Sequence, residues 1–174
     1  GITIMALLRD RRFISLALNH LLVDSMNGQR VILLTFFSVM LGMNNTALGT
    51  NSSAGGSSKA QLATAVGANT RASAVGSTAL GANASSESAG SIALGQEARA
   101  HDSANFAVAL GNKAEVMPDA NEYAHSGIAI GNASRVTRTD GIALGHEAYD
   151  EGVRGTAIGA GSHVYREAQD GIAM

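Results

Sequence analysis

A short triplet that returns at a nearly constant step constrains the fold of this chain more than any other feature. It consists of Ala, a large aliphatic residue and Gly, and it occurs at Ala65-Val66-Gly67, Ala79-Leu80-Gly81, Ala93-Leu94-Gly95, Ala109-Leu110-Gly111, Ala129-Ile130-Gly131, Ala143-Leu144-Gly145 and Ala157-Ile158-Gly159. Successive triplets are 14, 14, 16, 20, 14 and 14 residues apart, so the basic unit is 14 residues with insertions of two or six. A fixed period predicts a solenoid in which each unit stacks on the next.

Within each unit the pattern is that of β-strands. Residues 91–95, Ser-Ile-Ala-Leu-Gly, alternate in size with the two-residue period of a strand. Small or β-branched residues recur three and five residues after most of the repeat glycines, which predicts a second short strand. The glycines of the triplets are expected to adopt positive φ in turns. We expect large aliphatic residues such as Leu94 to be buried between strand layers, while Ala93 on the opposite side allows a second layer to come close.

The composition limits how such a roll is stabilised. The chain has 21 Gly, one Pro, three Tyr, four Phe and no Trp, so a core of large side chains is not available. Each unit offers about two large aliphatic side chains, worth about 1.5–3 kcal/mol each when buried. Ordering the backbone costs about 1–2 kcal/mol per residue. A single roll therefore needs further burial, and we expect self-association.

The first 49 residues differ from the rest, because they are hydrophobic and contain no regular repeat. Residues 13–26 have apolar side chains at helical spacing, and residues 31–43 form an apolar run of 13 residues. Three interpretations stay open for residues 1–49: an export signal, a membrane segment or a helical cap. Ala47 and Gly49 suit a signal-peptidase site, but Ala47-Leu48-Gly49 also fits a first repeat. We assign residues 50–62 to a Ser/Gly-rich linker and residues 63–174 to the repeats.

No pattern in the sequence indicates catalysis. The chain has no Cys, and its five His residues have no partner at metal-ligand spacing. Hexapeptide-repeat acyltransferases are also trimeric solenoids, but their six-residue period differs from the 14-residue step here. A formal net charge of −2 gives no argument for nucleic-acid binding. We expect no enzyme activity, no catalytic residue, no cofactor, no metal and no nucleic-acid partner.

The repeats resemble a known family. Residues 91–95, 127–134 and 141–145 are similar to the YadA-type head repeat of trimeric autotransporter adhesins, and the likeness covers residues 63–174. The resemblance implies a left-handed parallel β-roll, a homotrimer, and a place on the bacterial outer-membrane surface after export. It also implies a matrix ligand such as collagen. Membrane attachment is expected only through the N-terminal segment or a C-terminal anchor, because the sequence contains the family's head without its neck, stalk and anchor.

Two groups of residues are candidate ligand contacts. The family's binding motif, Asn-Ser-Val-Ala-Ile-Gly-x-x-Ser, is matched most closely by residues 128–134, where Ile128, Ile130 and Ser134 are the candidates; Ser126-Gly127 replaces its first two residues. The second group lies in the longest insertion, because insertions in solenoids emerge as loops, often on the binding face. Its candidates are Met117, Asp119, Glu122 and Tyr123.

Two functions stay open at this point. The first is a surface adhesin head that binds a host matrix or a neighbouring cell, and the second is a purely structural rod, such as a spacer or a fibre segment. Charged and aromatic residues gathered on one exposed stripe would favour the adhesin, whereas an even polar surface would favour the rod.

Overall fold

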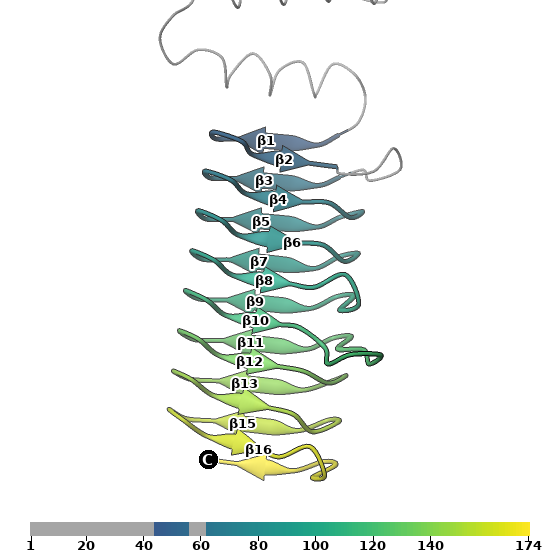
Figure 1. Cartoon of the computed structure of the whole chain (residues 1–174), viewed down its shortest axis with the longest axis vertical. Helices are drawn as coiled ribbons and strands as arrows, with labels where there is room; N and C mark the ends of the chain where they lie inside the picture. The colour runs from purple at the N-terminus through teal and green to yellow at the C-terminus, as the bar shows by residue number, and fades with distance from the viewer. Residues whose placement is uncertain (1–43, 56–61) are drawn as a thin grey trace, which may run out of the picture.

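The computed structural model describes residues 44–55 and 62–174, which form a rod of stacked strands (Figure 1). The helix predicted for residues 13–26 lies outside the described residues, as does most of the hydrophobic N-terminal segment. Across the two described ranges, no helix is long and apolar enough to cross a membrane.

Two parallel sheets run along the rod, and consecutive strands alternate between them. The nine-stranded sheet contains β1 (Thr46–Leu48), β3 (Thr64–Val66), β5 (Thr78–Leu80), β7 (Ile92–Leu94), β9 (Val108–Leu110), β11 (Ile128–Ile130), β13 (Ile142–Leu144), β15 (Thr156–Ile158) and β17 (Ile172–Ala173). The eight-stranded sheet contains β2 (Ser53–Ala54), β4 (Arg71–Ala72), β6 (Ser85–Ser86), β8 (Arg99–Ala100), β10 (Glu115–Val116), β12 (Arg135–Val136), β14 (Tyr149–Asp150) and β16 (His163–Val164).

Each repeat unit adds one strand to each sheet, in register with its neighbours. Ala93 pairs with Ala79 on one side and with Ala109 on the other, and the same register holds along the nine-stranded sheet. The prediction of a parallel β-solenoid with units of about 14 residues is confirmed. Ala47 pairs with Ala65, so the sheets begin at Thr46, before the boundary at residue 63 expected from the sequence.

The two faces of the nine-stranded sheet carry different residues. The central alanines point inward, and Ala93, Ala109 and Ala129 are 0% exposed. The flanking aliphatic residues point outward, so Leu94 is half-buried and Ile92 is 39% exposed. The expected alternation is therefore confirmed, but the expectation that Leu94 lies between the strand layers is wrong. Alanine occupies that place because the two layers of one roll lie too close together for leucine.

The side chains at two positions of each unit together fill the interior of the roll, so their sizes must match. We call this relation the size match. One position is the inward residue of each strand in the eight-stranded sheet, and the other is the residue just before each strand of the nine-stranded sheet. In the first half of the rod both are small, as in the pairs Ala72 with Ser77, Ser86 with Ser91 and Ala100 with Ala107. In the second half a larger residue is matched by Gly, as in the pairs Val116 with Gly127, Val136 with Gly141, Asp150 with Gly155 and Val164 with Gly171. The combined volume of the side chains at the two positions is therefore limited.

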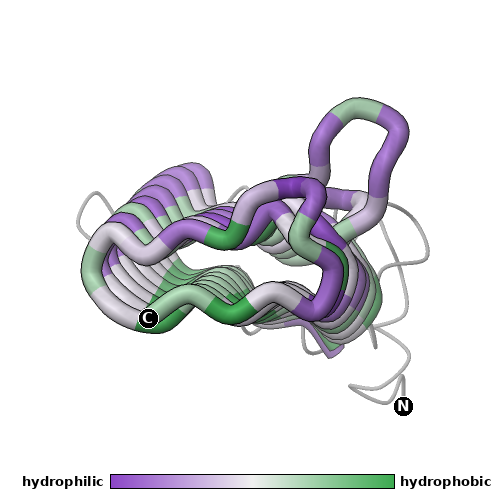
Figure 2. Tube along the Cα trace, turned by 90° about the horizontal axis from the view of Figure 1, so that it is seen from below, coloured by the Kyte–Doolittle hydropathy of each residue, from purple (hydrophilic) through white to green (hydrophobic). Residues whose placement is uncertain are grey.

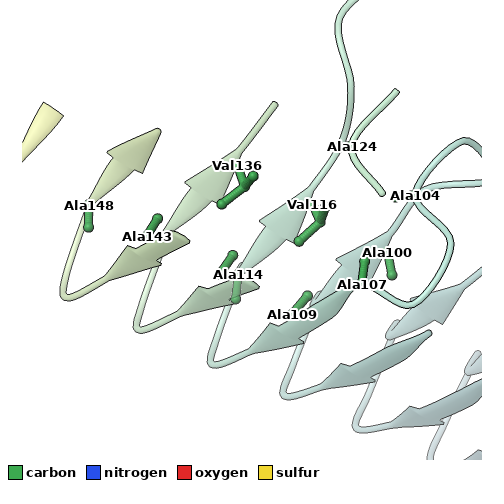
Figure 3. Close-up of a cluster of buried hydrophobic side chains, with 11 residues drawn as sticks. Ala100, Ala104, Ala107, Ala109, Ala114, Val116, Ala124, Val136, Ala143 and Ala148 are labelled. Atoms are coloured by element: carbon green, nitrogen blue, oxygen red, sulfur yellow. The ribbon is translucent and has the colours of Figure 1, made fainter. Parts of the chain in front are cut away.

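Contacts at Gly127 show why the match is needed. A Cβ on Gly127 would lie 2.8 Å from Cγ1 of Val116 and 3.0 Å from Cγ1 of Val136. Both valines extend into the space between the layers together with the surrounding alanines (Figure 3). The valine methyl groups thus fill the volume that a side chain at position 127 would need.

This match predicts a coupling between Val116 and Gly127. Gly127→Ala is expected to lower the free energy of unfolding by about 1–3 kcal/mol through overpacking, and Val116→Ala by about 2 kcal/mol through a cavity. The double variant is expected to recover part of both losses, because the new methyl group enters the vacated space. Urea unfolding of the four chains measures the coupling.

A distant pair provides the control for this cycle. Val164 lies three strands from Val116 in the eight-stranded sheet, so Gly127→Ala and Val164→Ala are expected to add without coupling. Simple additivity in both pairs would contradict the size match.

Candidate interaction surfaces

The outward face of the nine-stranded sheet is an apolar stripe along the rod. Each described strand of this sheet contributes one or two outward side chains, and none of them is charged. The first column along the stripe contains Thr46, Thr64, Thr78, Ile92, Val108, Ile128, Ile142, Thr156 and Ile172. The second contains Leu48, Val66, Leu80, Leu94, Leu110, Ile130, Leu144 and Ile158. Five of the nine residues in the first column and all eight in the second are aliphatic, the other four being threonine, and a partly exposed, largely apolar surface of this kind marks an interaction site.

The opposite face of the rod is polar. The outward column of the eight-stranded sheet consists of Ser53, Arg71, Ser85, Arg99, Glu115, Arg135, Tyr149 and His163. Seen along the rod, the layer that carries the C-terminus is rich in hydrophobic residues, and the longest loop projects from the other layer (Figure 2). The rod therefore has one face suited to burial and one suited to water.

Aromatic rings gather at the C-terminal end of the polar column. The rings of Tyr149 and His163 stack at 4.8 Å between centroids, and those of His163 and Tyr165 lie 4.1 Å apart. The guanidinium of Arg135 lies 5.5 Å from the centroid of the Tyr149 ring. This cluster was not predicted from the sequence, although its signal is visible there: Arg135, Tyr149 and His163 each stand four residues after a repeat glycine.

Glu151 links two of these rings. The hydroxyl of Tyr149 donates a hydrogen bond to Oε1 of Glu151 at 2.8 Å, and Nε2 of His163 lies 2.8 Å from Oε2. Burial alone would raise the pKa of Glu151, but the bonds to His163 and Tyr149 outweigh it and hold this pKa below its usual range. Burial, assisted by the bond to Glu151, raises the pKa of Tyr149. The cluster is therefore a hydrogen-bonded unit with an ionised carboxylate at neutral pH.

The longest insertion follows β10 and leaves the rod beside β11 (Figure 1). Its carboxylates are tied to arginines of later units. Oε2 of Glu122 lies 3.1 Å from Nη1 of Arg138, and Oδ2 of Asp119 lies 3.4 Å from Nη2 of Arg166. Thr139 also donates its hydroxyl to the carbonyl of Tyr123 at 3.1 Å. The insertion is thus fixed along the rod by contacts with later units. We call residues 117–127, which connect β10 to β11, the strap.

The sequence-derived candidates lie in different places. Met117, Asp119, Glu122 and Tyr123 are together in the strap, and Tyr123 is 60% exposed. Ile128 and Ile130 are half-buried and belong to the apolar stripe. Ser134 is 0% exposed, and its hydroxyl donates to the carbonyl of Gly131 at 3.1 Å. The structure therefore does not bring the residues of the motif onto one surface.

A carboxylate is buried inside the roll. Asp150 is 0% exposed and occupies the inward position where β10, β12 and β16 carry valine. Its Oδ1 accepts a hydrogen bond from the amide of Gly152 at 2.9 Å, and its Oδ2 accepts one from the amide of Ile142 at 2.9 Å. Burial raises the pKa of Asp150, against the opposing effect of these two bonds.

The raised pKa of Asp150 gives stability a definite pH dependence. The folded chain holds this proton more tightly than the unfolded chain, so ionisation favours unfolding and this contribution to stability grows as the pH falls. Asp150→Val is therefore expected to raise the free energy of unfolding at pH 7 by about 1–2 kcal/mol. This advantage should shrink as the pH falls toward about 4. Urea unfolding between these pH values, with the exposed-site variant Asp140→Asn as control, measures it. A loss of stability that is equal at every pH would instead assign Asp150 a purely hydrogen-bonding role.

The described residues contain no group of three or more His, Asp or Glu side chains placed to hold a metal ion. Three surfaces with distinctive chemistry have been described in residues 44–55 and 62–174: the apolar stripe, the polar column with its aromatic cluster, and the strap.

Comparison with known families identifies the repeats. The model of the YadA head domain repeat matches residues 58–84, 86–114 and 124–148. These segments contain β3 to β5, β7 to β9 and β11 to β13, with half of β6 and part of the insertion, while β10 lies between them. No curated protein sequence matches the chain at a significant level. The repeat match, together with the 14-residue parallel roll, supports a YadA-like head domain in this chain.

Proposed function

We propose that this chain is the head of a trimeric surface adhesin, in which three rolls associate through their nine-stranded sheets. The observation that carries the proposal is the contrast between the two outward faces. One is an uncharged apolar stripe, and the other carries Arg99, Arg135, Tyr149 and His163. Association through the apolar stripe would bury aliphatic side chains that water otherwise contacts, while the polar columns would face outward.

The match to the YadA head repeat supports this proposal. YadA-like heads form trimers and belong to autotransporter adhesins that are exposed on the cell surface, and the family is generally not enzymatic. For this chain we propose specifically that it forms a homotrimer on the outer-membrane surface. We also propose that it binds a matrix ligand such as collagen. The gathered arginine and aromatic side chains favour adhesion over a rod without a ligand, because such residues are enriched where proteins bind partners.

Sedimentation equilibrium tests the assembly. The full chain is expected to sediment at three times its mass of 17.7 kDa, and a folded monomer at micromolar concentration would contradict the trimer.

Adhesion is tested separately on immobilised collagen and on cultured cells. The double variant Arg135→Ala/Tyr149→Ala is expected to weaken attachment by about tenfold, because it removes two of the side chains most often found at binding hot spots. Asn132→Ala, a change at an exposed turn, serves as the matched control. A trimer that attaches to neither surface would leave the structural rod as the function.

A further inference from the structure

A cleft lies between the strap and the loop that follows β8. Its volume is about 430 Å³, within the range of about 300–1,000 Å³ found for small-molecule sites. His101 and Ser103 of the β8 loop line it, together with Asp119, Asn121, Glu122 and Tyr123 of the strap. Imidazole, hydroxyl, carboxylate and amide groups thus border one concave space beside an aromatic ring.

The carboxylates of the cleft are already balanced by arginines. Asp119 pairs with Arg166, and Glu122 lies within 3.1 Å of Arg138 and 3.8 Å of Arg166. These pairs reduce the attraction of the cleft for a free cation. Each carboxylate has about four lone-pair positions, so a carboxylate paired with arginine retains sites that accept hydrogen bonds from hydroxyl groups. The charge balance therefore favours a neutral, hydroxyl-rich ligand over an ion.

Tyr123 supplies an apolar surface at the same place. Its ring is stacked on His125, with 5.0 Å between the centroids and 24° between the planes, and the residue is 60% exposed. His125 is held in turn, because its Nδ1 accepts a hydrogen bond from the amide of Asn105 at 3.1 Å. The ring is thus supported on one side, and its amphipathic character suits a ligand that has both apolar C–H groups and hydroxyls.

We propose that this cleft binds a neutral saccharide unit, with Tyr123 packing against the C–H face of the sugar ring. Asp119, Asn121 and Glu122 would bond to its hydroxyls. The biological use of this site rests on the adhesin function proposed above, and it names the ligand class for that head. In a trimer the cleft would occur three times, so weak single contacts would be strengthened on a glycan-covered surface.

Saturation-transfer NMR on the full chain tests the site directly. The probes are the methyl glycosides of galactose, mannose and N-acetylglucosamine, with lysine methyl ester and inorganic phosphate as charged controls. At least one glycoside is expected to receive saturation and the charged probes are not. Absence of transfer to all three glycosides, or preferential binding of a charged probe, would overturn the proposal.

A pair of aromatic variants locates the binding. Tyr123→Ala is expected to weaken glycoside binding by about tenfold. Phe106→Ala removes a ring that is 68% exposed but neither lines the cleft nor belongs to the aromatic cluster, and it should leave binding unchanged. Circular dichroism confirms that both variants fold. Equal effects of the two changes would contradict the site.

Attachment of the same variants to cells separates this inference from the adhesin proposal. If no glycoside binds while the native chain still attaches to cells, the saccharide site is wrong and the adhesin proposal stands. If glycosides bind in a Tyr123-dependent way but the chain attaches to no surface, the site stands and the adhesin proposal is wrong.

Discussion

Leu94→Asp is expected to convert the proposed trimer into separate chains and to lower the melting temperature of the protein. Leu94 belongs to the outward apolar stripe, so the charge would enter the surface between subunits and not the interior of one roll. Each subunit would lose about 1.5–3 kcal/mol of side-chain burial, and each carboxylate would be desolvated without a partner. Since three copies are affected together, we expect no trimer at micromolar concentration in sedimentation equilibrium.

Gln96→Asp is the matched control for this experiment. Gln96 is exposed and lies only two residues from Leu94, at a turn outside the stripe. It adds the same carboxylate without entering the proposed interface, so the trimer should persist. A Leu94→Asp chain that remains trimeric would show that the subunits associate through another surface.

Gly111→Ala is expected to lower the free energy of unfolding by about 3 kcal/mol or more. Gly111 has φ of 136°, a region that residues with a side chain occupy only with strain. A Cβ at this position would also lie 2.5 Å from the carbonyl oxygen of Gly131 in the next unit. The clash involves backbone, which relaxes only if the two units separate. Thermal and urea unfolding measure the loss.

Gly161→Ala distinguishes the clash from the backbone strain. Gly161 has φ of 67°, and a Cβ there would meet no heavy atom within 4 Å. Its replacement should therefore cost only about 1–2 kcal/mol. If the two variants lose the same stability, the close approach between repeat glycines is not what requires glycine.

The repeat determined most of the fold, because its period fixes both the number of strands in a unit and their register. Positive φ at the triplet glycines was likewise predictable, and values from 114° to 141° are observed at Gly67, Gly81, Gly95, Gly111, Gly131, Gly145 and Gly159. The inside and the outside of the roll were not predictable from alternation alone. Alternation shows that Leu94 and Ala93 lie on opposite faces, but the distance between the two layers decides which of them fits inside.

The surfaces were harder to predict than the fold. Asp119 and Arg166 are far apart in the sequence, and the stacking of the units brings their side chains together. Neither residue alone indicates this pairing. Tyr149 and His163 are separated by one unit, so their stacking follows from the register once the roll is known. Side-chain proximity in a solenoid thus becomes visible only when the sequence is aligned unit by unit.

The size match inside the roll also limits which duplications and deletions of repeat units can yield a folded rod. Each added unit would extend the rod by about 4.8 Å. A recombination joint placed between Val116 and Gly127 would bring a valine from one unit against the serine or alanine of another, or leave an alanine facing a glycine. A joint within the Ala-aliphatic-Gly triplet keeps each matched pair together. We therefore expect duplications and deletions that yield folded heads to begin and end in the triplets.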